Sequence, residues 1–163
     1  MKKILILSDT HSYCDGAIEK YAVQHDEVWH AGDWGDVALF DKLSQLAPVR
    51  GVYGNIDSME LRKVCPKVSE FTCEDVRVYI THIGGYPNRY NEDTKRDIMR
   101  LKPKLVICGH SHILKVMYDK KLNHLHVNPG AIGISGFHKV RTMVSMEIHG
   151  NDMRNMNVIE FER

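Results

Sequence analysis

The stretch Ile4-Leu5-Ile6-Leu7-Ser8-Asp9-Thr10-His11 decides how this chain is built. Residues 4–7 form a short continuous apolar run, which is typical of a strand buried on both faces of a sheet. Asp9 and His11 follow at once, so a carboxylate and an imidazole stand on the loop that leaves the carboxyl end of that strand. Open α/β sheets normally carry their functional sites on such loops. The apolar run is too short for a signal peptide, and we interpret it as a first strand.

The order of strand, polar loop and helix recurs through the first third of the chain. We expect helices over 15–24 and 37–46, and strands over 26–29 and 49–53. This repetition predicts parallel strand pairing with right-handed crossovers.

The second half is richer in strands. The pattern predicts a hairpin of strands 68–72 and 76–80, a helix over 92–101, and strands over 105–108, 113–118, 124–128, 141–148 and 153–161. A second, mixed sheet packed against the first would accommodate these strands. We therefore expect an α/β (α+β) fold in a single domain over residues 1–163, without internal repeats or linkers.

Composition excludes several classes of partner. Lys and Arg number 22 against 21 Asp and Glu, which leaves a formal charge of +1 and no basic footprint for nucleic acid or a membrane surface. No stretch approaches the roughly 20 apolar residues of a membrane span. The four cysteines form no C-x-x-C pair, so we expect free thiols in a reducing, cytoplasmic location.

Short polar motifs follow the predicted strands at five places. They are Asp9-Thr10-His11, Gly32-Asp33, Gly54-Asn55, Thr81-His82 and Gly109-His110-Ser111-His112. Each has an ordinary explanation by itself, because Asp33 suits a turn or a helix N-cap and Asn55 suits a turn. Together they bring carboxylates, an amide and imidazoles to one expected edge of the sheets, a donor set that suits two divalent cations.

The ordered set D-x-H, G-D, G-N, H and G-H-x-H resembles the calcineurin-like metallophosphoesterase superfamily. The resemblance runs from residue 4 to about residue 134, and the short chain without a cap domain is most similar to the small bacterial and archaeal phosphodiesterases of that family. It implies a four-layer α/β/β/α sandwich with two mixed β-sheets and a metal site at their shared edge.

The resemblance also implies a role for each motif residue. Asp9, His11 and His112 would bind a first metal, Asn55, His82 and His110 a second, and Asp33 would bridge the two. Asp33, Asn55 and His82 are the residues that it places closest to catalysis. Four of the seven ligands are imidazoles, which favours Mn²⁺ first, with Fe, Zn²⁺ or Ni²⁺ as alternatives, over Mg²⁺ or Ca²⁺.

The function implied is metal-dependent hydrolysis of a small phosphate ester. Two cations roughly 3.5–4 Å apart can hold a bridging hydroxide that attacks phosphorus, so no protein nucleophile is needed. A phosphodiesterase is favoured. A phosphomonoesterase with the same site, and a non-catalytic metal-binding scaffold for protein partners like the relatives in the retromer coat, stay open. Apolar residues on the outer strands leave a homo-oligomer open as well, whereas a nuclease is disfavoured by the balanced charge.

One position departs from the family pattern. Many relatives continue the G-N motif with a histidine that assists the leaving oxygen, but here Ile56 and Asp57 follow Asn55. Isoleucine cannot donate a proton, and an ordinary Asp has a pKa near 4, which makes it a poor acid at neutral pH. We therefore expect dependence on acidic leaving groups such as aryl phosphates.

Several neighbours of the motifs are weaker candidates. His30 is either a partner that orients the ligands or a structural histidine. Segment 84–90 suggests a lid in which Arg89 binds phosphate, and the turn Asn128-Pro129-Gly130 is expected beside the site. The loop after it directs His138, Lys139 or Arg141 toward substrate, or else is an ordinary connection. Four other histidines lack a site-like context and are expected on the surface or in strands: His25, His124, His126 and His149.

Overall fold

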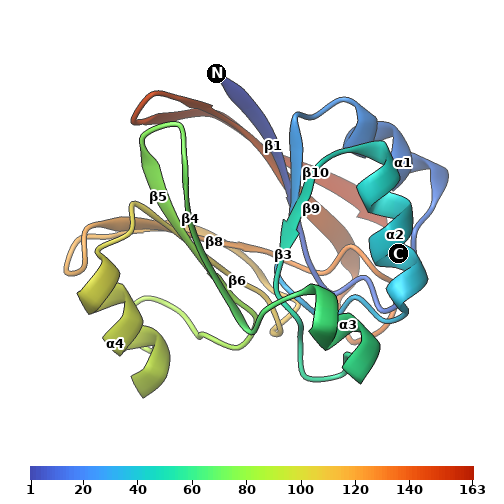
Figure 1. The fold of residues 1–163 in the computed structure, drawn as a ribbon, viewed down its shortest axis with the longest axis horizontal. Helices are drawn as coiled ribbons and strands as arrows, with labels where there is room; N and C mark the ends of the chain where they lie inside the picture. Colours follow the sequence, from blue (N-terminus) through green and yellow to red (C-terminus); the bar gives the residue numbers. More distant parts are fainter.

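Two five-stranded β-sheets pack face to face in the computed structural model, which describes residues 1–163 (Figure 1). The first sheet has the order β10-β9-β1-β2-β3, with bounds β1 (Lys2–Leu7), β2 (Glu27–His30), β3 (Val49–Gly51), β9 (Val140–His149) and β10 (Asp152–Glu162). The second has the order β4-β5-β6-β8-β7, with bounds β4 (Val68–Cys73), β5 (Val76–Thr81), β6 (Leu105–Cys108), β7 (Leu114–Asp119) and β8 (His124–Pro129).

Helices cover the outer faces of both sheets. Three of them, α1 (Gly16–Val23), α2 (Val37–Leu46) and α3 (Met59–Val64), lie on the first sheet, and α4 (Glu92–Leu101) lies on the second (Figure 1). Both sheets are mixed. In the first, β1, β2, β3 and β10 run in one direction and β9 runs antiparallel to them; in the second, β5, β6 and β8 are parallel between antiparallel edge strands. The predicted four-layer α/β/β/α sandwich is therefore confirmed.

Strand β1 shows why a continuous apolar run stands at the centre of the first sheet. Ile4 and Ile6 point into the core between the two sheets, where Ile80 and Ile107 meet them. Leu5 and Leu7 point the other way, into the core beneath the helices. Because successive side chains of a strand face opposite sides, a strand covered on both sides needs apolar residues at every position.

Helix α3 is the one element that the sequence pattern did not predict. It has only six residues, and the side chain of Ser58 caps it by accepting a hydrogen bond from the Leu61 backbone N–H. Leu61 alone is buried, so the segment shows no repeating apolar face. The predicted strand 49–53 is also shorter than expected and ends at Gly51.

Three of the four histidines without a site-like context are buried. The expectation that they lie on the surface or in strands holds for His124, His126 and His149, which are strand residues, and is wrong for His25. His25 follows α1 and contacts the Tyr21 carbonyl and the Ser145 hydroxyl. His124 and His126 lie in β8, where the Tyr90 hydroxyl is 2.9 and 2.7 Å from their ring nitrogens. A polar hydroxyl within reach allows these imidazoles to be buried in the neutral form.

The cysteines agree with the expectation from their spacing. All four are free thiols, and three of them are buried. No helix of the structure is both long enough and apolar enough to span a bilayer.

The buried His126 predicts a pH dependence of stability. Burial, reinforced by the neighbouring His124, lowers the pKa of His126 from 6.5 to about 4. In the unfolded chain the His126 imidazole takes up a proton near pH 6.5, whereas in the folded chain it does so only near pH 4. The free energy of unfolding therefore decreases as the pH falls from 6.5 to 4. We expect His126→Gln to remove about 2 kcal/mol of the stability difference between pH 7.5 and pH 5, measured by urea unfolding of the metal-free protein. An equal pH dependence in the variant and the wild type would contradict this assignment.

Candidate metal centre

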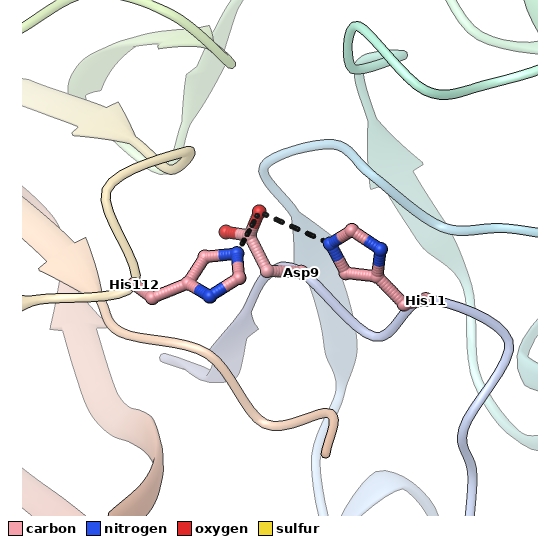
Figure 2. A group of neighbouring side chains, drawn as sticks. All are labelled: Asp9, His11 and His112. Carbon is pink, nitrogen blue, oxygen red and sulfur yellow. Dashed lines mark ion pairs between the residues drawn. The ribbon is translucent and has the colours of Figure 1, made fainter. Parts of the chain in front are cut away.

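The first group of metal-ligating side chains comes from loops after β1 and β6. Asp9, His11 and His112 place one donor atom each within 4.8 Å of one another. Figure 2 shows the carboxylate of Asp9 between the two imidazoles, with Oδ1 at 3.3 Å from His112 Nε2 and 4.0 Å from His11 Nε2. Residues about a hundred positions apart meet here because β1 and β6 end at the same edge of the facing sheets.

A second group lies beside the first and comes from loops after β2, β5 and β6. Asp33, His82 and His110 also place one donor atom each within 4.8 Å of one another. Asn55, after β3, adds a carboxamide oxygen at 3.0 Å from His82 Nε2 and 3.1 Å from His110 Nδ1. The second group thus combines oxygen and imidazole donors, as the first does.

Asp33 lies between the two groups. Its Oδ2 atom is 3.2 Å from His82 Nε2 in the second group and 3.6 Å from His11 Nε2 in the first. The structure therefore brings together all seven side chains that the sequence motifs single out, with a carboxylate at the junction.

The backbone of the site is unusual for residues that carry side chains. Five of the seven have positive φ angles, from 45° to 75°: Asp9, His11, Asp33, His110 and His112. This left-handed region is uncommon for non-glycine residues, and such residues concentrate at functional sites. The turns aim neighbouring side chains at one point, which regular extended backbone would direct to alternating faces.

Hydrogen bonds with neighbouring groups determine which donor atoms of Asp9 and His82 face the site. Asp9 Oδ2 accepts hydrogen bonds from the Ser8 hydroxyl at 2.6 Å and from the His110 N–H at 3.1 Å. His82 Nδ1 donates to the Ala31 carbonyl at 2.7 Å, so Nε2 presents its lone pair to the site. Ser8 is a partner that the sequence motifs did not single out, although it immediately precedes Asp9.

The remaining donor atoms fit a cation. Asp9 Oδ1 and His11 Nε2 are buried and have no hydrogen-bond partner in the protein. Buried polar atoms are rarely left in this state, and a divalent cation would satisfy a carboxylate oxygen and an imidazole nitrogen together.

In the metal-free protein, charges and hydrogen bonds of the second group favour the ionised forms of His82 and Asp33. Burial acts to lower the pKa of His82, but its hydrogen bond to Asp33 and the charge of Asp9 prevail and raise it. Burial acts to raise the pKa of Asp33, but His82 and the Ile56 N–H prevail and lower it. The Asp33 carboxylate is therefore available as an anionic ligand at neutral pH.

His30 is a structural histidine whose hydrogen bonds go to Thr10 and Gly32 and not to the ligand side chains. Its Nδ1 accepts from the Gly32 N–H at 3.0 Å, so Nε2 carries the proton and donates to the Thr10 hydroxyl at 3.0 Å. Its ring stacks on Trp34 with 3.7 Å between centroids. Complete burial holds the pKa of His30 well below its usual range. The neutral ring connects the backbone that carries Asp9 to the backbone that carries Asp33.

Asp57 also has a structural role. Its Oδ2 accepts from the Gly54 N–H at 2.7 Å and the Trp34 N–H at 3.2 Å, and its Oδ1 accepts from the Gly35 N–H at 2.9 Å. A buried carboxylate that accepts three N–H groups joins the loops after β2 and β3 and has no free oxygen for a leaving group. Neighbouring Ile56 is 48% exposed, and its N–H donates to Asp33 Oδ1 at 3.1 Å.

Two surrounding segments support the histidine loop 109–112. The Asn128 side chain donates to the Gly109 carbonyl at 3.0 Å and the Ser111 hydroxyl at 3.2 Å, so the Asn-Pro-Gly turn lies beside the site as expected. Tyr86, from the segment suggested as a lid, shares a hydrogen bond with Ser111. Arg89 in that segment is exposed, and its backbone N–H closes a turn onto the Tyr86 carbonyl.

Of the three candidates that follow the Asn-Pro-Gly turn, the structure brings one to the site. His138 packs edge-on against His112 with 5.2 Å between ring centroids, and its Nε2 lies 2.7 Å from the Gly133 carbonyl. Lys139 is exposed. Arg141 is not available to substrate, because its buried guanidinium contacts the Ile132 carbonyl and the carboxylate of Asp15; for this residue the alternative of an ordinary connection holds.

Gly54 offers a test of the close approach between the loops after β2 and β3. A methyl group at Gly54 would overlap Oδ1 and the backbone nitrogen of Asp33, whereas one at Gly16 would meet nothing within 4 Å. We expect Gly54→Ala to displace Asp33 and weaken metal binding about 10- to 100-fold, the range seen when supporting contacts of a metal site are lost. Metal titration monitored by calorimetry measures this, with Gly16→Ala as the matched control. Equal affinities in the two variants would contradict the expectation.

Comparison with known proteins places this geometry in a family. A probable metallophosphoesterase of Methanocaldococcus jannaschii is 28% identical over 134 residues, 77% of this chain and 66% of the relative, so the chain spans about two thirds of that relative's length. A solved archaeal phosphodiesterase has a similar fold, with a TM-score of 0.71, 22% identity and coverage of 96% of this chain and 99% of that chain. Zinc-bound Vps29 from Entamoeba histolytica also has a similar fold, with a TM-score of 0.73, 16% identity and coverage of 98% of both chains. Residues 1–151 match the model of the calcineurin-like phosphoesterase superfamily domain, and the chain therefore belongs to that superfamily.

Proposed function

We propose that this protein is a metal-dependent phosphodiesterase that hydrolyses small phosphate esters at a dinuclear centre. Family membership and the archaeal relative support a metal-dependent phosphoesterase. The observation that carries the finer proposal is the pair of adjoining donor groups with Asp33 between them. In this proposal Asp9, His11 and His112 hold the first ion and Asn55, His82 and His110 the second, with Asp33 bridging.

The chain's own residues have distinct tasks in this proposal. When bound, two divalent ions lower the pKa of a water molecule and neutralise charge on the phosphoryl oxygens. The contact with Ala31 keeps His82 in the tautomer that ligates through Nε2. Asn55 directs its oxygen toward the histidines, which leaves its N–H₂ group to donate to a phosphoryl oxygen.

Manganese and a diester are the preferred metal and substrate class. Mixed oxygen and imidazole donors suit Mn²⁺, Fe, Zn²⁺ or Ni²⁺ better than Mg²⁺. The structural likeness to an archaeal phosphodiesterase supports the diester. A second candidate is a metal-binding scaffold without turnover, and the zinc complex of Vps29, which has a similar fold, is a reason to include it in the test.

The first prediction concerns restoration of activity by metal. We expect metal-stripped protein to hydrolyse bis-p-nitrophenyl phosphate only after Mn²⁺ is added, and faster than p-nitrophenyl phosphate. Asp33→Asn and His82→Ala should lower kcat/KM at least about 100-fold, because each removes a ligand and not only a supporting contact. Asp36→Asn and His149→Ala, at residues outside the site, are matched controls.

Each other outcome of this assay points elsewhere. Faster cleavage of the monoester would replace the diesterase with a phosphomonoesterase. Binding of two metals without turnover of either ester would favour the scaffold.

The second prediction concerns the leaving group. The Asp57 carboxylate accepts hydrogen bonds from backbone N–H groups, and the Ile56 side chain has no acidic proton. Departure of the leaving group therefore depends on the acidity of the leaving alcohol. In a series of aryl methyl phosphates we expect kcat/KM to fall steeply as the leaving-group pKa rises. Ile56→His, at an exposed position beside Asn55, should flatten this dependence by adding a general acid. A flat dependence in the wild type would contradict the expectation.

A further inference from the structure

A cavity of about 240 Å³ opens beside the second donor group. Asn55 and His82 of that group form one side of it, and Arg62 and Lys67 line it as well. No carboxylate is among its lining residues. A chain whose charges nearly balance therefore concentrates positive charge next to the proposed reaction site.

Arg62 is held in place by its neighbours. Its Nε donates to the Asp57 carbonyl at 3.0 Å, and its guanidinium lies over the Tyr53 ring with 4.5 Å to the centroid. These contacts restrict the side chain and leave its terminal N–H groups to bind another partner. A guanidinium that is already oriented loses less conformational freedom when it binds a carboxylate or a phosphate.

The charge of Arg62 is not neutralised by an ion pair. The arginine ion pairs of the chain involve other residues: Arg50, Arg96, Arg100, Arg141 and Arg154. Lys67 contributes less to the positive charge of this cavity, because it also lines a neighbouring hollow that contains Asp93 and Asp97. Arg62 is thus the principal cation of the cavity.

The cavity also has apolar lining residues, which suit the carbon atoms of a ligand. Tyr53 and Ile83 line the cavity. The cavity thus combines two residues of the second donor group, apolar side chains and a guanidinium.

We propose that this cavity binds a second anionic group of the substrate, separate from the phosphate that is hydrolysed. The substrates are phosphodiesters whose retained alcohol carries a carboxylate or a further phosphate, and Arg62 binds that group while Lys67 adds to the positive potential. This inference rests on the proposed phosphodiesterase function. It adds a specificity site that comes from α3 and the segment after it.

The kinetic test compares two diesters that differ only in this charge. Both have p-nitrophenol as leaving group, and the retained alcohol is 3-hydroxypropionate in one and its methyl ester in the other. With Mn²⁺-loaded wild type we expect kcat/KM to be about tenfold higher for the carboxylate, chiefly through a lower KM, as one charge-assisted contact allows. Arg62→Ala should bring the ratio of the two substrates close to one.

Lys63→Ala is the matched control. Lys63 is on the same short helix and is exposed, but it does not line the cavity. Its removal takes the same charge from α3, so the preference should persist if the effect is local. Arg62→Lys keeps the charge without the two-pronged donor and should retain only part of the preference. Thermal unfolding of each variant identifies any loss of folding.

A binding measurement separates this inference from the proposed function. In p-nitrobenzylphosphonate analogues of the two diesters, a methylene group replaces the leaving oxygen. Calorimetry with Mn²⁺-loaded protein should show about tenfold tighter binding of the carboxylate analogue, lost in Arg62→Ala and kept in Lys63→Ala.

The outcomes are distinct. Preferential binding without turnover of either diester would overturn the phosphodiesterase and leave the anion site standing. Turnover of both diesters without preference in rate or binding would overturn the anion site alone. A preference that Arg62→Ala and Lys63→Ala reduce equally would also overturn it, because the effect would then come from overall charge.

Discussion

The structure depends on the burial of two carboxylates, Asp9 and Asp33, at the edge shared by two sheets. Both are almost completely removed from solvent, and Asp9 Oδ1 lacks a hydrogen-bond partner. Burying an ionised carboxylate is costly unless opposite charge or hydrogen-bond donors are provided. The surrounding imidazoles, the Ser8 hydroxyl and the backbone N–H of Ile56 provide part of this, and bound cations would provide the rest. The loops around the site can be understood as the arrangement that makes this burial tolerable.

Rigid support keeps these carboxylates in position. His30 links the backbone near Asp9 to Gly32, just before Asp33, and Asp57 joins the residues just after Asp33 to the loop of Asn55. Both groups are buried and fully engaged with backbone or hydroxyl partners, so neither takes part in proton transfer in the proposed mechanism. The left-handed backbone of five ligand residues persists because these contacts and the strands on either side determine it.

Family membership and charge distribution answer different questions about function. The superfamily match, together with the donor geometry, supports phosphoester chemistry at the edge of the sheets. The fold by itself does not decide what such a site does, because one fold can carry different functions. Arg62, which lies over Tyr53 outside the motifs, bears on substrate preference and not on the type of reaction in this proposal.

The strands, three of the four helices and the seven donor residues could be predicted from the order of residues alone. Apolar runs such as residues 4–7 report burial on both faces directly, and polar motifs after strands are brought together wherever parallel strands end at one edge. The role of side chains whose partners are distant in sequence became clear only from the folded chain. Asp57 became a structural carboxylate, Arg141 turned away from the site, and His126 was buried against Tyr90. It also revealed α3 and Arg62, because a six-residue helix with one buried side chain has too little periodicity to be predicted, and the environment of a charge is set by what packs around it.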